Sequence, residues 1–186
     1  MRNSFRLRIQ AAGRFTPPTA QLTEQERAMV FRAVNAVIES DGFLAQPGAD
    51  LLVNLRSELD LDGAAWDASL GTALTPEELE ESQISPSAAD YLCYMAMLAG
   101  LADGKISESE RITIDGFCDA LRLPDSRRME IVEACQRGIL EANILMNLPD
   151  VICSSELAQR FASELNVDRE TLEAVADSVL QSLAEA

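Results

Sequence analysis

Residues 95–110 have the sequence MAMLAGLADGKISESE, in which an apolar helical pattern is followed by an Asp-Gly turn and a Ser-x-x-Glu helix start. Asp103-Gly104 is typical of the end of a helix, because glycine adopts backbone angles that stop helical winding. Ser107 and Glu110 have the spacing of a capping box, in which each side chain accepts a hydrogen bond from the other residue's backbone amide. The stretch therefore predicts a helix, a tight turn and a second helix.

Most of the chain after Thr23 shows the same helical spacing. Apolar residues recur every three or four positions, and alternating β-branched runs are lacking. Capping residues mark helix starts at Thr23, Thr75, Ser85 and Asp168. We predict an all-α fold of about nine helices in a single domain over residues 21–186, with C-terminal helices in 125–184.

The helical pattern repeats along the chain. A shift of 62 residues places Asp41-Gly42 on Asp103-Gly104 and aligns the apolar stripes on either side without a gap. Few of the aligned residues are identical, so helical periodicity accounts for part of the match. The coincidence of the turn with its flanking stripes nevertheless predicts two half-repeats, at about residues 23–61 and 85–123.

The chain is strongly acidic. Its 186 residues include 31 Asp and Glu against 15 Lys and Arg, for a net charge of −16. This charge repels phosphate backbones, so we expect no nucleic-acid partner and favour basic proteins or cations. An acidic helix start is a candidate partner surface, although such clusters usually form only a solvated face. Its members are Glu77, Glu78, Glu80 and Glu81.

Histidine is absent, which removes the commonest general base and the commonest zinc ligand. We therefore expect no enzymatic activity and no catalytic residues. The four cysteines form no Cys-x-x-Cys pair, and we interpret them as buried small side chains in a reducing compartment. No apolar run reaches the roughly 20 residues of a membrane span. These features favour the cytoplasm.

Residues 1–20 differ from the rest of the chain because they contain four arginines and no acidic residue. They lack the apolar core of a secretory signal. Phe5, Leu7 and Ile9 alternate with polar residues in the period of a strand. We predict a basic N-terminal arm that is flexible or docked on an acidic surface.

The acidic turn is similar to the second half of an EF-hand calcium loop. With Gly104 at loop position 6, Glu110 takes position 12, where the EF-hand has its bidentate glutamate. Positions 1 and 3 fall on Ala99 and Leu101, which offer no side-chain oxygen. An EF-hand-like calcium sensor therefore stays an alternative function. A carboxylate-dependent hydrolase is a less favoured one, because no defined pair of acids is evident.

The order of helix, Asp-Gly turn, Ser-x-x-Glu and helix over residues 95–123, in an acidic chain without histidine, resembles the tellurite-resistance TerB-like family. The resemblance implies one helical domain of two pseudo-symmetric halves. It also implies a stress-response or scaffold role without enzymatic activity. The acidic turns of such a domain are expected to chelate metal, here weakly bound calcium or magnesium.

The resemblance carries over to individual residues as candidate cation ligands. These are Asp103, Glu108 and Glu110 in the second turn, but only Asp41 in the first. Asp50 is a further candidate ligand if the first turn is wound differently. The first turn is poorer, because Gln46 and Gly48 stand where the second has its two glutamates. Capping offers a simpler interpretation of the second turn: Glu110 completes the capping box, and Glu108 interacts favourably with the helix dipole.

Overall fold

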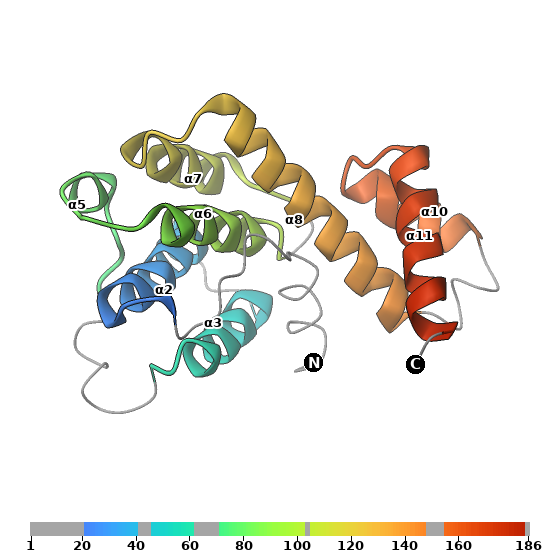
Figure 1. The fold of residues 1–186 in the computed structure, drawn as a ribbon, viewed down its shortest axis with the longest axis horizontal. Coiled ribbons are helices and arrows are strands. Elements are labelled where there is room, and N and C mark those ends of the chain that lie inside the picture. Colours follow the sequence, from blue (N-terminus) through green and yellow to red (C-terminus); the bar gives the residue numbers. More distant parts are fainter. Residues whose placement is uncertain (1–20, 41–45, 62–70, 103–104, 148–154, 185–186) are drawn as a thin grey trace. The chain divides into compact units, whose positions relative to one another are not determined.

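The computed structural model describes residues 21–40, 46–61, 71–102, 105–147 and 155–184. This part of the chain consists of eight helices and contains no strand, which confirms the all-α prediction. The helices are α2 (Glu24–Glu39), α3 (Gln46–Glu58), α5 (Pro76–Glu80), α6 (Pro86–Gly100), α7 (Glu108–Ala120), α8 (Asp125–Met146), α10 (Ser155–Glu164) and α11 (Arg169–Ala184), coloured along the chain in Figure 1. The predicted arm, residues 1–20, lies outside the described residues.

The chain divides into two compact units. The first includes α2, α3, α5, α6, α7 and the start of α8 as far as Ile131. The second includes α8 from Val132 onward, with α10 and α11. Each unit has its own buried apolar residues.

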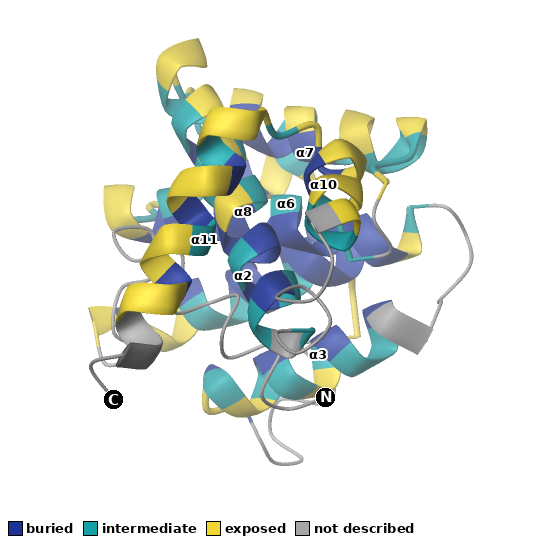
Figure 2. Ribbon diagram, turned by 90° about the vertical axis from the view of Figure 1, so that its right-hand side faces the viewer, coloured by how far each residue is buried: buried dark blue, intermediate teal, exposed yellow. Residues whose placement is uncertain are grey.

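Helix α6 is the central element of the first unit. Eleven of its 15 residues are buried, so it is apolar around its whole circumference. Helix α2 packs against α6, α3 and α7, and α6 packs against α7. Figure 2 shows the resulting core as the dark blue segments of α2 and α6. The largest fully buried side chains of α6 are Tyr94, Leu92, Met95 and Leu98.

Side-chain caps begin the helices at the predicted residues. The Thr23 hydroxyl accepts from the Glu26 amide at 3.2 Å, and the Glu26 carboxylate accepts from the Thr23 amide at 2.8 Å. Thr75 and Ser85 cap α5 and α6, and each is followed by proline at the first helical position. The carboxylate of Asp168 accepts from the amide of Thr171 at 2.7 Å at the start of α11.

Helices α3 and α7 end with the same backbone geometry. Asp60 and Arg122 both have φ of 53°, and the amide of the following residue bonds in both cases to a carbonyl five residues back at 3.0 Å. This is the Schellman arrangement, with its left-handed residue just beyond the helix. Adding 62 to the bounds of α3, 46 and 58, gives the bounds of α7, 108 and 120, and adding 62 to 60 gives 122.

The second unit is built on α10 and α11, which pack against each other. Their buried stripe consists of Ala162, Leu165, Leu172, Val175 and Val179. Asn166 has φ of 53° and ends α10 in the left-handed conformation that asparagine tolerates well. None of the described helices is long and apolar enough to cross a membrane.

Candidate functional site

The candidate cation ligands of the second turn are only partly within the described residues. Glu108 and Glu110 are described, whereas Asp103 lies outside the described residues, as does Asp41 of the first turn. Both glutamates belong to the first turn of α7, where acidic side chains interact favourably with the helix dipole.

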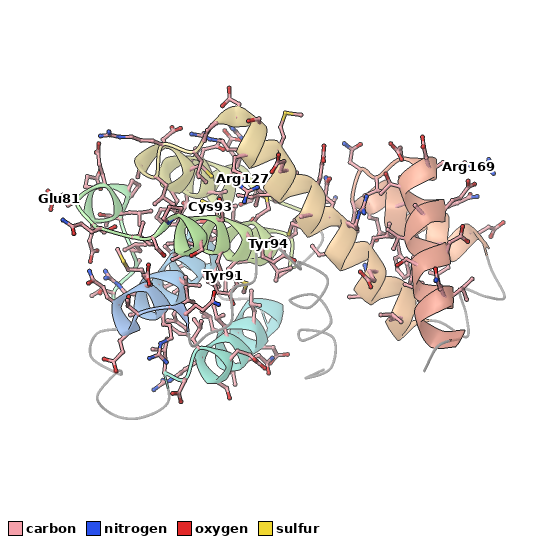
Figure 3. All side chains as sticks on the ribbon, viewed as in Figure 1. Glu81, Tyr91, Cys93, Tyr94, Arg127 and Arg169 are labelled. Atoms are coloured by element: carbon pink, nitrogen blue, oxygen red, sulfur yellow. The ribbon has the colours of Figure 1, made fainter. Side chains whose placement is uncertain are left out.

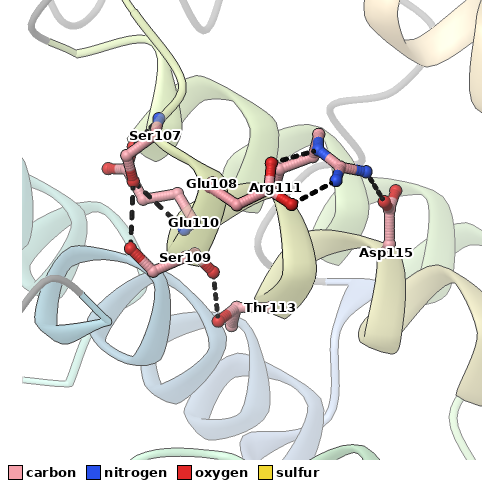
Figure 4. Close-up of polar contacts among 7 residues, drawn as sticks. All are labelled: Ser107, Glu108, Ser109, Glu110, Arg111, Thr113 and Asp115. Carbon is pink, nitrogen blue, oxygen red and sulfur yellow. Dashed lines mark hydrogen bonds and ion pairs between the residues drawn. The ribbon is translucent and has the colours of Figure 1, made fainter.

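The carboxylate of Glu110 is used for capping. Its Oε2 accepts from the amide of Ser107 at 2.8 Å, and the Ser107 hydroxyl accepts from the Glu110 amide at 3.2 Å. Figure 4 shows Glu110 folded back onto Ser107. The hydroxyl oxygens of Ser107 and Ser109 are 3.3 Å apart. The predicted capping box is therefore confirmed. A cation at this glutamate has to share a carboxylate whose Oε2 already accepts a hydrogen bond from a helix-start amide.

The carboxylate of Glu108 faces another direction. It forms two hydrogen bonds with Arg111, of 2.6 Å to Nη2 and 3.1 Å to Nε, and Arg111 Nη1 donates to Asp115 at 3.1 Å. The hydrogen bond from Arg111 and its positive charge lower the pKa of Glu108. Figure 4 shows this chain of charges along the exposed face of α7. Glu108 is thus ionised, but its charge is already compensated.

Within the described ranges, no group of three or more Asp, Glu or Cys side chains is placed to hold a metal ion. Asp50, the other candidate in the first turn, is half-buried, and its backbone carbonyl accepts from the side-chain amide of Asn54 at 2.7 Å. The predicted cation site therefore depends on how the undescribed residues Asp41 and Asp103 are placed.

The first and second turns differ for a packing reason. A Cβ at Gly48 would lie 2.9 Å from Cγ2 of Ile38, closer than real contacts of this kind. Any larger side chain at position 48 therefore requires α2 and α3 to separate or Ile38 to change rotamer. Position 48 corresponds to Glu110 after the shift of 62 residues. The close packing of α2 and α3 explains why the first turn has no equivalent glutamate.

The four acidic residues of the α5 surface are exposed, but only two of them lie close to an arginine. The carboxylate of Glu78 is bidentate with Arg32, at 2.6 and 2.7 Å, and this hydrogen bonding lowers the pKa of Glu78. Glu80 lies 3.4 Å from an Arg122 nitrogen. Within the described part of the chain, Glu77 and Glu81 have no ion-pair partner. Figure 3 shows Glu81 at the outer side of α5.

Sequence reasoning missed the second role of Glu26. Its Oε1 accepts from the amide of Ser85 at 2.9 Å, so the carboxylate that caps α2 also binds the residue that caps α6. Burial by itself would raise the pKa of Glu26, but the hydrogen bonds from Ser85 and Thr23 outweigh it and lower the pKa to about 2. The capping box was visible in the sequence, but the third bond joins residues 59 positions apart.

An ion cluster between α6 and α8 was also missed. Arg127 Nε donates to Asp90 at 3.1 Å, and Arg127 Nη1 donates to Glu130 at 2.6 Å. These hydrogen bonds raise the pKa of Arg127. The Arg127–Glu130 spacing is a recognisable helical pair, but nothing in the sequence connects Arg127 with Asp90 on another helix.

A pair of thiols lies in the same unit. The Sγ atoms of Cys93 on α6 and Cys118 on α7 are 3.6 Å apart, and the two residues are 1% and 5% exposed. The predicted burial of cysteine is confirmed for these two and for Cys135, whereas Cys153 lies outside the described residues. The spacing of 25 residues gave no indication of this contact.

The chain matches no family model, and no curated protein or solved structure is similar enough to be identified as a relative. The resemblance to the TerB-like family therefore depends on residues 95–123 themselves.

Proposed function

We propose that this chain is a non-enzymatic, TerB-like helical domain of the cytoplasm that acts as a scaffold in a stress-associated assembly. It binds basic surfaces of protein partners through the acidic face of α5. The observation that carries the proposal is the exposure of Glu77, Glu78 and Glu80 on α5 and of Glu81 at its C-terminal cap, within a chain of net charge −16. An excess of negative charge favours association with a basic partner by long-range attraction.

The α5 surface is held in place from three sides. The Thr75 hydroxyl caps the helix by accepting from the Glu78 amide at 3.2 Å, and the Glu78 side chain is bound by Arg32 of α2. Pro76 packs so closely on α7 that a Cβ at Gly116 would lie 3.1 Å from its Cγ. A surface that is ordered before binding loses less entropy when a partner docks, which supports a binding role for α5.

The proposed TerB-like architecture has two half-repeats, α2 with α3 and α6 with α7. It is supported by the shared offset of 62 between the bounds of α3 and α7 and between the left-handed residues Asp60 and Arg122. The same offset joins the caps Thr23 and Ser85. Local sequence has diverged between the halves, and Gly48 with Glu110 is the clearest difference.

The test measures how much partner protein is captured by the immobilised chain when only the charges of the α5 surface are changed. Immobilised wild-type chain is compared with Glu77→Lys/Glu81→Lys, because these two acids have no ion-pair partner in the described part and their replacement leaves the Arg32–Glu78 pair intact. We expect the variant to lose the captured partner by at least about tenfold, since reversing charges at a complementary interface costs more than 1.4 kcal/mol.

The matched control is Glu156→Lys/Asp177→Lys, which makes the same change in net charge on exposed residues of α10 and α11. It should retain the partner, and 0.5 M salt should release the partner from wild type by screening the attraction. Equal loss in both double variants would show a net-charge effect and contradict a specific α5 surface. Thermal unfolding of both variants checks that each is folded.

As a subsidiary part of the proposal, the turn ending at Glu110 binds calcium or magnesium weakly. Glu110→Gln separates the two roles of this residue, because glutamine preserves a capping box but is a poor replacement for a carboxylate ligand. Millimolar magnesium or calcium should raise the Tm of wild type more than sodium chloride at equal ionic strength, and this excess should disappear in Glu110→Gln. A wild-type response no greater than that to sodium chloride rules out the site.

A further inference from the structure

The contact between Cys93 and Cys118 brings two buried thiols together from separate helices. Their Sγ atoms are 3.6 Å apart, within the range of a thiol hydrogen bond. A disulfide bond is about 2.05 Å long, so the sulfur atoms need to approach by only about 1.5 Å.

The helices that carry the two thiols are closely packed. Near the end of α6, a Cβ at Gly100 would lie 3.1 Å from Cδ1 of Ile114 on α7. Figure 3 shows Cys93 on α6, in the interior of the first unit. Because α6 and α7 are in contact at both places, the thiols are held together by the core and do not depend on a mobile loop.

We propose that Cys93 and Cys118 form a peroxide-sensitive pair that closes into a disulfide and links α6 to α7. The site is independent of the acidic surface of α5. It is a reversible modification site in the core of the first unit, and its expected oxidant is a small hydroperoxide.

Burial and the neighbouring charges assign different roles to the two sulfurs. The hydrogen bond between the two thiols lowers the pKa of Cys118, and the Arg128 guanidinium acts in the same direction against burial and the charges of Asp115 and Asp119. The hydrogen bond with Cys118 and burial raise the pKa of Cys93. Cys118, which is also the more exposed of the two, is therefore the attacking thiolate.

The reaction balances with hydrogen peroxide as the oxidant. The Cys118 thiolate attacks one peroxide oxygen, the O–O bond breaks, and hydroxide leaves and takes a proton, which gives a sulfenic acid and water. The sulfur of Cys93 then attacks Cys118, an S–S bond replaces the S–O bond, and the departing hydroxide takes the Cys93 proton. Two thiols and one peroxide become one disulfide and two waters. With so little exposure, larger disulfide reagents have poor access to either sulfur.

Trypsin separates the four cysteines, which makes the product easy to identify. Cleavage after lysine and arginine places Cys93 in residues 57–105, Cys118 in 112–122, Cys135 in 129–137 and Cys153 in 138–160. The reduced full-length chain is treated with hydrogen peroxide, its remaining thiols are alkylated, and the digest is analysed without reduction. We expect a cross-linked 57–105/112–122 species that has lost two hydrogen atoms and is separated again by dithiothreitol.

Three variants and a stability measurement complete the experiment. Cys118→Ala should abolish the cross-link, Cys135→Ala should retain it, and Cys93→Ala should leave a Cys118 sulfenic acid that dimedone labels. The oxidised wild type should melt on the order of 10 °C higher than the reduced form. Absence of the cross-link, bonding to Cys135 or Cys153 in its place, or a lower melting temperature after oxidation would overturn the proposal.

Discussion

Glu26 combines a local and a tertiary role in one carboxylate. It accepts hydrogen bonds from Thr23 within the capping box and from Ser85 at the start of α6, and it is 6% exposed. Hydrogen bonds to a charged acceptor are stronger than those to a neutral one. The ionised carboxylate therefore stabilises the junction of α2 and α6 more than a helix cap alone.

We predict that Glu26→Gln lowers the free energy of unfolding by about 2 kcal/mol at pH 7, because the amide brings a donor group against a backbone N–H. The pKa of Glu26 falls from an ordinary 4.5 to about 2 in the folded chain. The contribution is therefore present above pH 4.5 and is lost as the pH falls toward 2. Urea unfolding of both proteins across this range measures the difference.

The matched control is Glu24→Gln, which removes the same charge from an exposed residue in the first turn of α2. It should change stability by only a few tenths of a kcal/mol. A difference between wild type and Glu26→Gln that stays constant from pH 7 to pH 2 would show that the carboxylate charge is not responsible.

At the scale of single elements, the close packing of α2 against α3 depends on the absence of a side chain at Gly48. We predict that Gly48→Ala destabilises the chain by about 1 kcal/mol, although alanine is the better helix former, because overpacking against Ile38 outweighs the helix propensity. Chemical denaturation measures the change. Ser57→Ala, on an exposed position of the same helix, is the control and should be neutral or slightly stabilising. A stabilised Gly48→Ala would show that Ile38 moves freely.

At the left-handed residue after α7, we predict a substitution that stabilises the chain. Arg122 has φ of 53°, where a Cβ is unfavourable, and its contact with Glu80 is an exposed pair of little energetic value. We expect Arg122→Gly to raise the free energy of unfolding by roughly 0.5–1 kcal/mol. The same substitution at Arg111, inside α7, should lower it by about 1 kcal/mol. Destabilisation by both would contradict the importance of the left-handed conformation.

The sequence was a good guide to the elements because their starts are determined locally. Thr23, Thr75, Ser85 and Ser107 lie within three residues of the amides they cap, so composition and spacing alone identified them. The candidate site was less predictable. The capping role of Glu110 was foreseen, but its competing role as a cation ligand depends on Asp103, which is outside the described residues.

Contacts between distant helices were not predictable from spacing. Arg32 binds Glu78 across 46 residues, and Cys93 meets Cys118 across 25. Each contact depends on which faces α2, α5, α6 and α7 present to one another, and many helix packings preserve the same apolar stripes. The sequence pattern predicted where the helices begin, but it did not predict which polar groups meet.

At the scale of the whole molecule, the division into two units has a consequence for stability. Leu98 of α6 is fully buried in the first unit, and Leu165, the residue after α10, is 4% exposed in the second. Regions with separate cores open separately, and each opening has its own free energy. Hydrogen exchange of the native chain measures these opening free energies helix by helix.

We predict that Leu165→Ala lowers the protection of α10 and α11, by about 3 kcal/mol in opening free energy, and leaves α6 unchanged. Leu98→Ala is the reciprocal control, which should lower the protection of α2 and α6 and spare α11. The two leucines lose the same atoms, so any difference reports the location of each core and not the chemistry of the substitution. A uniform loss of protection along the chain in either variant would show that the molecule opens as one cooperative unit.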